Sequence, residues 1–129
     1  MERLVISSGT TWEAIVGYSR AVRVGAHVYV SGTTAIDETG VVFGKDDAYT
    51  QTIYILQTVE TALQRCGAKL QDVVRTRIYV TDIDLWEQVG RAHGDVFGSI
   101  CPASTMVEVS RLIAPDLLVE IEVEALVLG

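Results

Sequence analysis

A run of residues near the C-terminus alternates between apolar and acidic side chains, and this alternation constrains the fold more than any other feature of the chain. The run extends from Leu117 to Val127 and predicts a β-strand, because successive side chains of a strand point to opposite faces of its sheet. One face of the strand is therefore expected to pack under helices, while the other face carries carboxylates. The apolar set is Val119, Ile121, Val123 and Ala125, and the acidic set is Glu120, Glu122 and Glu124.

Two segments have the helical periodicity needed to cover the apolar face of such a sheet. Residues 47–66 carry a single apolar stripe at helical spacing. A second helix is predicted over residues 85–97, where Asp84 and Glu87 have the spacing of a capping box. The stripe of the first helix consists of Ala48, Thr52, Leu56, Val59, Leu63 and Cys66, with Asp47 suited to its N-terminal end and Gly67 to its C-terminal cap.

The remaining segments read as strands separated by short turns. The resulting order, β-β-β-α-β-α-β-β, predicts an α+β fold in which two helices cover one face of a mostly antiparallel sheet. In the strand before the second helix, we expect Val74, Ile78 and Val80 on the covered face. The other face of that strand carries Arg75, Arg77 and Tyr79. The predicted strands are Arg3–Ser7, Arg20–Val24, His27–Ser31, Val73–Thr81, Thr105–Leu112 and Leu117–Val127, with room for another short strand near Thr33–Ile36.

Length and charge narrow the class of protein. With 129 residues, the chain suffices for one domain over residues 1–129 and is too short for two ordinary ones. Its net charge is −7 and its 10 basic residues are scattered, which argues against a nucleic-acid partner. The N-terminal sequence lacks the features of a signal peptide, and no apolar run approaches the ~20 residues of a membrane span. We therefore expect a cytoplasmic protein with no membrane partner.

Generic catalytic and metal-binding motifs are missing from the sequence. His27 falls in a predicted strand and His93 in a predicted helix, and neither has acidic or cysteine residues at a metal-binding spacing. No metal site is therefore expected. Cys66 and Cys101 lie far apart and are interpreted as free thiols of a reducing compartment.

The open face of the predicted sheet has two interpretations. Its three carboxylates at alternate positions are compatible with a plain solvated surface. The same face also carries arginines and a tyrosine that can pair with carboxylates, as in an oligomer interface where charge pairs set the orientation. The residue pattern by itself does not decide between them.

Segments in three parts of the chain, between about Ile15 and Val127, form one pattern of order and spacing. The first part holds Ile15-Val-Gly-Tyr18-Ser, Val24-Gly25 and Val28-Tyr-Val-Ser31-Gly32, and the second holds Arg77-Ile-Tyr79-Val-Thr-Asp82 and Phe97-Gly98. The third and most specific part holds Pro102-Ala103-Ser104-Thr105-Met-Val107-Glu108-Val109, Arg111-Leu112 and Val119-Glu120-Ile-Glu122. Together these segments resemble the RidA/YjgF family, also described as L-PSP endoribonuclease-like.

The resemblance implies a chorismate-mutase-like fold and a homotrimer with small-molecule clefts between subunits. Active members hydrolyse 2-imino acids and their enamine tautomers to 2-keto acids and ammonia, without a cofactor or metal. By matching positions, the cleft is expected to contain Tyr18, Ser31 and Gly32, with Glu122 as the catalytic glutamate that activates water. Cys101, next to the specific motif, is included among the residues near the cleft.

One position departs from the family pattern. Ser104 stands where the family has the arginine that grips the substrate carboxylate, and Gly90 stands where it often has an asparagine. Leaving a buried charge without its partner costs roughly 2–5 kcal/mol, or about 30- to 3000-fold in affinity or rate. Another arginine can restore the charge only if the fold brings it there, and the candidates are Arg20, Arg91 and Arg111. Arg20 and Arg91 are interpreted as surface residues, and Arg111 as an ordinary part of the family's strand.

Two functions from different classes follow from this departure. In the first, the protein is a deaminase that is not expected to act well on 2-imino acids. Its cleft binds a different imine, enamine or carbonyl compound, charged or uncharged, with Glu122 as general base and Ser104 as a polar anchor. In the second, it is a non-catalytic trimer that binds a small molecule or a partner. A raised pKa of the cleft carboxylate would favour the enzyme.

Overall fold

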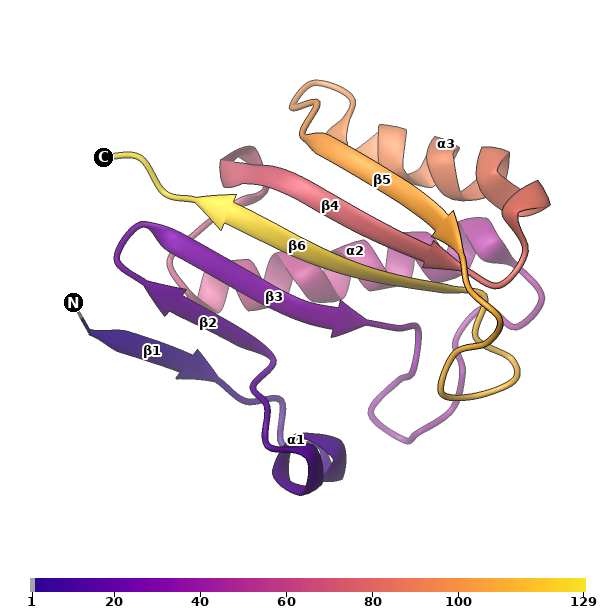
Figure 1. The fold of residues 1–129 in the computed structure, drawn as a ribbon, viewed down its shortest axis with the longest axis horizontal. Helices are drawn as coiled ribbons and strands as arrows, with labels where there is room; N and C mark the ends of the chain where they lie inside the picture. The colour runs from indigo at the N-terminus through magenta and orange to yellow at the C-terminus, as the bar shows by residue number, and fades with distance from the viewer. Residues whose placement is uncertain (1) are drawn as a thin grey trace.

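The structure, a computed structural model, describes residues 2–129. It confirms the predicted α+β fold: a six-stranded sheet with helices α2 and α3 on one face (Figure 1). No helix in the described residues has the length and apolar character needed to cross a membrane. The strands are β1 (Arg3–Ile6), β2 (Ala21–Val24), β3 (His27–Thr33), β4 (Val73–Val80), β5 (Ala103–Glu108) and β6 (Val119–Leu126), and the α-helices are α1 (Thr11–Val16), α2 (Ala48–Arg65) and α3 (Trp86–Phe97), with 3₁₀ turns at Leu70–Asp72 and Ile83–Leu85.

The sheet order is β1-β2-β3-β6-β4-β5, so the alternating strand β6 lies in the interior of the sheet. Every neighbouring pair is antiparallel except β4 and β5, which are parallel. Parallel neighbours need a crossover connection, and α3 supplies it here. The mostly antiparallel sheet was predicted, whereas the parallel edge pair was not.

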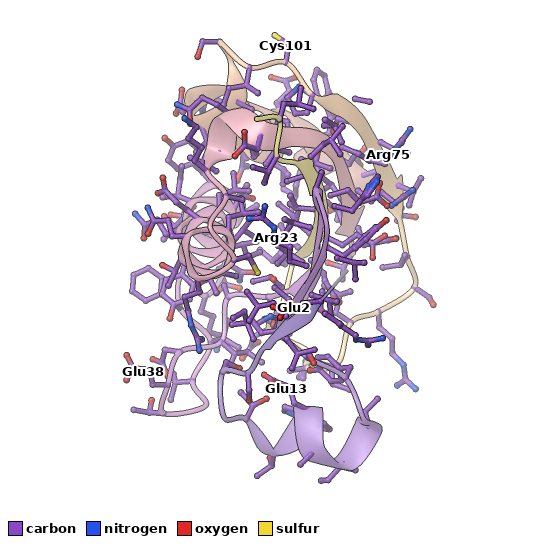
Figure 2. All side chains as sticks on the ribbon, turned by 90° about the vertical axis from the view of Figure 1, so that its left-hand side faces the viewer. Glu2, Glu13, Arg23, Glu38, Arg75 and Cys101 are labelled. Atoms are coloured by element: carbon purple, nitrogen blue, oxygen red, sulfur yellow. The ribbon has the colours of Figure 1, made fainter. Side chains whose placement is uncertain are left out.

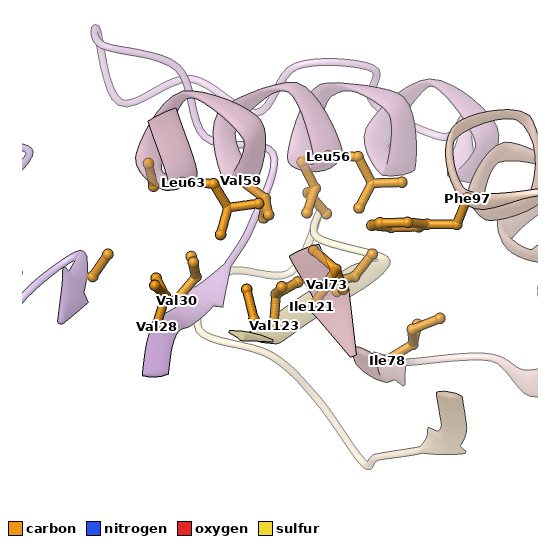
Figure 3. Close-up of a cluster of buried hydrophobic side chains, with 14 of the residues drawn as sticks. Val28, Val30, Leu56, Val59, Leu63, Val73, Ile78, Phe97, Ile121 and Val123 are labelled. Carbon is orange, nitrogen blue, oxygen red and sulfur yellow. The ribbon is translucent and has the colours of Figure 1, made fainter. Parts of the chain in front are cut away.

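The core lies between the sheet and the two long helices (Figure 3). The apolar stripe of α2 is buried as predicted, and Val59 and Leu63 are fully inaccessible. The side chain of Asp47 accepts a hydrogen bond from the backbone N–H of Thr50 at 3.0 Å. Gly67 has a φ of 76°, a conformation that favours glycine after a helix. Both predicted ends of α2 are therefore confirmed.

The prediction for the start of β4 was wrong by one residue. Val73 is buried and Val74 is 48% exposed, because the pairing of β4 with β6 shifts register between Val73 and Arg75. The extra residue of such an irregularity inverts the side-chain alternation on one side of it. Beyond it, Arg75, Arg77 and Tyr79 lie on the less covered face as expected.

Local predictions near other element ends also needed correction. The capping box of Asp84 and Glu87 does not form; instead Asp82 accepts from the N–H of Asp84 and caps the 3₁₀ turn that precedes α3. The strand predicted over Thr105–Leu112 ends at Glu108, and that near Thr33–Ile36 is reduced to the end of β3 and a single bridge between Ile36 and Val42. Helix α1 was not predicted, because its six residues are too short for a periodic pattern.

Gln51 of α2 holds two loops to the helical layer. Its side chain is fully buried and donates to the carbonyls of Gly44, at 3.3 Å, and Asp116, at 3.0 Å. Its amide oxygen accepts from the N–H of Leu118 at 2.9 Å. Gln51 thus fixes the segment that leads into β6.

Replacing Gln51 with leucine is expected to lower the free energy of unfolding by about 2–4 kcal/mol. The substitution keeps the side-chain volume but leaves an N–H and two carbonyls without their partner, at about 1–3 kcal/mol for each group that stays buried. Urea unfolding followed by circular dichroism measures the change. The matched control is Gln57→Leu on the exposed face of α2, which should change stability by less than about 0.5 kcal/mol. Equal effects of both substitutions would contradict the role of Gln51.

Candidate ligand groove

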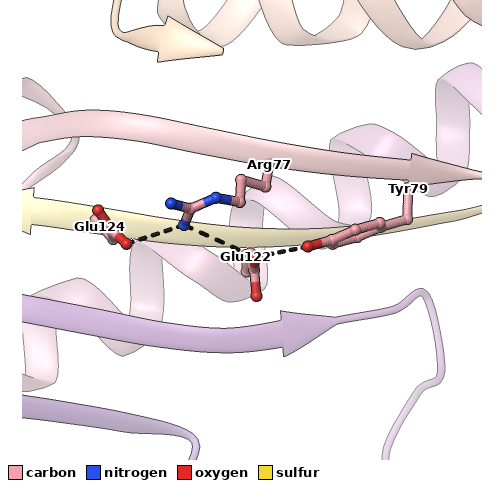
Figure 4. Close-up of polar contacts among 4 residues, drawn as sticks. All are labelled: Arg77, Tyr79, Glu122 and Glu124. Carbon is pink, nitrogen blue, oxygen red and sulfur yellow. Dashed lines mark hydrogen bonds and ion pairs between the residues drawn. The ribbon is translucent and has the colours of Figure 1, made fainter. Parts of the chain in front are cut away.

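The open face of the sheet carries a network of charged and polar side chains (Figure 4). The hydroxyl of Tyr79 donates to Glu122 Oε1 at 2.7 Å. Nη1 of Arg77 donates to Glu124 Oε1 at 2.9 Å and lies 3.8 Å from Glu122 Oε1. These groups are about one third exposed, so each pair contributes modestly to stability. Glu122, predicted as the catalytic residue, is therefore engaged in this network.

Glu120 has different surroundings, set by an irregularity in β3. Ser31 and Gly32 together oppose the single residue Glu122, between the pairs Val30–Val123 and Thr33–Ile121. Such a β-bulge bends the strand and redirects side chains beside it. A Cβ atom at Gly32 would lie 2.1 Å from Glu120 Oε2. The carboxylate thus lies against the backbone of the bulge, and a side chain at this position would have to displace it.

The surroundings of Glu120 raise the pKa of its carboxyl. Burial is the main cause, because it disfavours the charged form, and the nearby negative charge of Glu122 acts in the same direction. The positive charge of Arg20 opposes both effects without cancelling them. Glu120 therefore holds its proton to a higher pH than an ordinary glutamate, as is typical of a general acid or base.

Arg20 precedes β2 and reaches the same bulge. Its Nη2 donates to the carbonyl of Gly32 at 2.5 Å, while its buried Nε has no hydrogen-bond partner among the described residues. No carboxylate of residues 2–129 lies within ion-pair distance of this guanidinium. Burial lowers the pKa of Arg20, and the charges of Tyr18, Glu13 and Glu120 only partly offset this effect.

Arg20 and Glu120 line one groove of about 790 Å³ at the end of the sheet near α1. Tyr18 and Gly32, predicted from the sequence, line the same groove, so the structure brings these two residues together with a carboxylate and a cation. Apolar side chains from α1 and from the loop after β5 complete this part of the lining: Trp12, Val16 and Ile113.

Glu13 positions the short helix that carries this wall of the groove. Its buried carboxylate accepts hydrogen bonds from the N–H and the hydroxyl of Ser8 and from the hydroxyl of Thr10. Burial raises the pKa of Glu13, but these hydrogen bonds lower it by more. The Glu13 carbonyl accepts from Tyr18 N at 3.1 Å, which ties Tyr18 to the helix end. Figure 2 shows Glu13 where α1 meets the sheet.

The other residues predicted for the site lie outside the lining of this groove. Ser31 donates its hydroxyl to the carbonyl of Ser19 at 2.6 Å, so it joins β3 to the segment before β2. Ser104 lies on edge strand β5, where its hydroxyl accepts from Thr76 at 2.8 Å, and Thr76 Oγ1 lies 2.9 Å from His93 Nε2. Cys101 is exposed before β5, with its thiol 3.3 Å from the carbonyl of Gly98.

Two residues of the groove escaped the sequence analysis. Glu120 and Glu122 have the same parity in β6, so the alternation assigned both to one face without separating them. Gly32 was the available signal, because a glycine inside a strand indicates a bulge or a close approach. Arg20 was named as one of three arginines able to supply a charge, but its interpretation as a surface residue was wrong, because strand pairing buries its Nε beside the bulge. Within the described residues, no three His, Cys, Asp or Glu side chains gather as a metal site.

Comparison with known proteins agrees with this architecture. The family model described as Endoribonuclease L-PSP matches residues 8–127. A RutC family protein of Pyrococcus abyssi is 35% identical over 95% of this chain and 95% of its own length. An uncharacterised protein of Streptomyces coelicolor is 37% identical over 93% of this chain and 89% of its own length.

Solved structures show the same fold. A member of the YjgF/YER057c/UK114 family from Mycobacterium tuberculosis superposes with a TM-score of 0.90, at 53% identity, over 98% of this chain and 100% of that one. The YjgF gene product of E. coli gives a TM-score of 0.82, at 28% identity, over 95% of this chain and 98% of that one. The groove thus lies in a protein with the same small α+β fold as these solved structures. The chain is a member of the RidA/YjgF family, whose model carries the L-PSP endoribonuclease description.

Proposed function

We propose that the protein binds a small molecule in the groove beside α1 and hydrolyses an imine or enamine there, with Glu120 as the general base. The observation that carries this proposal is a partly buried carboxylate of raised pKa, held against Gly32 in a groove that also contains Tyr18. The sequence analysis gave this role to Glu122. Glu120 fits it better, because Glu122 is bonded to Tyr79 and does not line the groove.

The chemistry requires few groups. The ionised Glu120 accepts a proton from a water molecule as the water oxygen bonds to the imine carbon, and the imine nitrogen takes up a proton from solvent. The protonated Glu120 then gives its proton to the amino group of the resulting amino alcohol. This group leaves as ammonia while the hydroxyl proton passes to solvent, so that imine and water become carbonyl compound and ammonia. Tyr18 lines the groove, where its hydroxyl can donate a hydrogen bond to the reacting molecule. An enamine first gains a proton at carbon and loses one from nitrogen to become the imine.

The endoribonuclease description of the family model is less compatible with this chain. RNA binding depends on Lys and Arg side chains that neutralise phosphates, and the net charge here is −7. The groove itself contains the carboxylates of Asp37, Glu38 and Glu120. The alternative to deamination is therefore a trimer that binds a small molecule without turnover, which the loss of the family arginine at Ser104 favours.

We also propose that the chain forms a homotrimer. The sheet face that carries the Arg77 network is not covered by helices and is free to pack against another copy. Ser104 and Cys101 do not line the groove of their own chain, so they would line a groove only if it belonged to a neighbouring copy. Light scattering coupled to size-exclusion chromatography should give about three times the chain mass of 14.0 kDa. A species of one chain mass would refute the trimer and leave Ser104 and Cys101 outside any groove.

Two matched carboxamide substitutions test the choice of catalytic residue. Glu120→Gln is expected to lower the hydrolysis rate of freshly generated 2-iminobutyrate by roughly 10²- to 10⁴-fold, the usual contribution of a general base. Glu122→Gln should keep the rate at pH 8 within a few fold. Ammonia release measures the reaction. The reverse result would restore Glu122, and a wild-type protein inert toward this and neutral enamines would favour the non-catalytic alternative.

The pH dependence follows from the surroundings of Glu120. The base must be ionised, so kcat/KM should fall as pH decreases through the pKa of Glu120, which lies above the ordinary value of 4.5. Glu122→Gln should move this acidic limb to lower pH, because it removes a negative charge that raises the pKa of Glu120. Arg77 and Tyr79 contact the carboxylate of Glu122, and Tyr79 is also the cross-strand neighbour of Glu120. A limb that stays in place in Glu122→Gln would contradict the assignment.

A further inference from the structure

We propose that Arg20 binds the carboxylate of the groove's ligand, and that the ligand is a small organic acid with a bulky apolar group. This inference rests on the proposed function for the location of the reaction and deepens it by naming the class of ligand. Arg20 supplies from within the groove the positive charge that is missing at Ser104.

The guanidinium of Arg20 is only partly satisfied by the protein. Removing a guanidinium from water costs free energy unless an opposite charge or hydrogen bonds replace the water. Arg20 has one hydrogen bond, to the carbonyl of Gly32, and a buried Nε without a partner among the described residues. A ligand carboxylate beside the guanidinium satisfies the remaining charge, and a planar guanidinium suits the two oxygens of a carboxylate.

Arg20 and Glu120 meet at the bulge of β3. Both side chains lie against the same residue: Arg20 binds the Gly32 carbonyl, and Glu120 Oε2 contacts the Gly32 backbone. A carboxylate held by Arg20 therefore lies only a few atoms from the proposed base. A molecule whose reacting carbon is next to its carboxylate fits this separation.

The other cation of the groove has different properties. Arg65 is exposed, and its Nη1 donates to the carbonyl of Ser7 at 2.9 Å. Water screens its charge, so it has little need of a ligand. Arg65 also belongs to α2 rather than to the bulge region, which makes it a suitable comparison within the same groove.

The groove lining near helix α1 is apolar and exposed. Trp12 is 52% exposed, Val16 67% and Ile113 67%, although all three are large apolar side chains lining the groove. Apolar area removed from water contributes about 25 cal/mol per Å². An aromatic or branched group on the ligand covers this lining, whereas a two- or three-carbon acid leaves it exposed to solvent.

Three stable probes separate the charge from the apolar group. 3-Phenylpropionate has both features, 3-phenylpropanamide has the same shape without the charge, and propionate has the charge without the ring. We expect 3-phenylpropionate to bind the wild-type protein at least ~10-fold more tightly than either, because one charge-assisted contact is worth about 1.5–3 kcal/mol. NMR titration of the protein amides measures the affinities, and the comparison needs no substitution.

Variants then assign the charge to its residue. Arg20→Gln should lower the affinity for 3-phenylpropionate by roughly 10- to 100-fold and leave the affinity for the amide within about two-fold. Arg20→Lys should have an affinity for 3-phenylpropionate between those of the wild type and Arg20→Gln. Arg91→Gln, on α3 and outside the groove lining, should leave all three affinities within about two-fold, and Arg65→Gln should weaken 3-phenylpropionate less than Arg20→Gln does. Trp12→Ala should reduce the advantage of 3-phenylpropionate over propionate. Thermal unfolding identifies any variant that does not fold, in which case the wild-type comparison of acid and amide decides.

The outcomes separate this inference from the proposed function. Equal affinity for acid and amide, or loss of acid binding in Arg65→Gln and not in Arg20→Gln, overturns the role of Arg20 even if imines are hydrolysed. Equal binding of propionate and 3-phenylpropionate overturns the apolar part. Acid binding that depends on Arg20, in a protein inert toward every imine, supports the inference while the proposed hydrolysis fails.

Discussion

The packing of β6 under the helices is the constraint on which the rest of the structure depends. Its apolar face is buried beneath α2, and this burial fixes the register of the strand, since a shift by one residue would place carboxylates in the core. Once the register is fixed, the three glutamates must project from the open face. The strand's two neighbours then determine what each glutamate does. Arg77 and Tyr79 of β4 donate hydrogen bonds to Glu124 and Glu122, respectively. Glu120 instead lies against the bulge of β3. Three residues of one type, equally spaced in one strand, thus acquire different chemistry from their partners.

The groove combines groups that oppose one another electrostatically. Arg20 and Glu120 are both partly withdrawn from water, and each partly offsets the cost that burial imposes on the other. They are nevertheless not joined by an ion pair within the described residues. A direct ion pair would satisfy both groups and lower the pKa of the carboxyl. The separation imposed by the Gly32 backbone keeps the carboxyl basic and the guanidinium available, which is a more useful arrangement for a ligand site than for stability.

The sequence predicted the layers well and the site only in part. Long periodic patterns specified α2, β6 and their faces, because burial of apolar side chains determines both the pattern and the fold. Features that depend on a single residue's pairing were missed, among them the exposure of Val74, the cap at Asp82 and the short helix α1. Tyr18 and Gly32 were placed in the groove by resemblance to the family. The different surroundings of Glu120 and Glu122 could not be predicted from the sequence, because they arise from one extra residue in β3. The alternation of side chains in β6 does not depend on a bulge in the neighbouring strand.

Tyr18, Arg20, Gly32 and Glu120 all belong to one chain, and this has a consequence for how the groove comes into being. Their arrangement follows from intramolecular strand pairing between β2, β3 and β6, so no neighbouring copy has to supply any of the four groups. Association with another copy can cover or extend the groove, but the charged pair is already in place when a chain has folded.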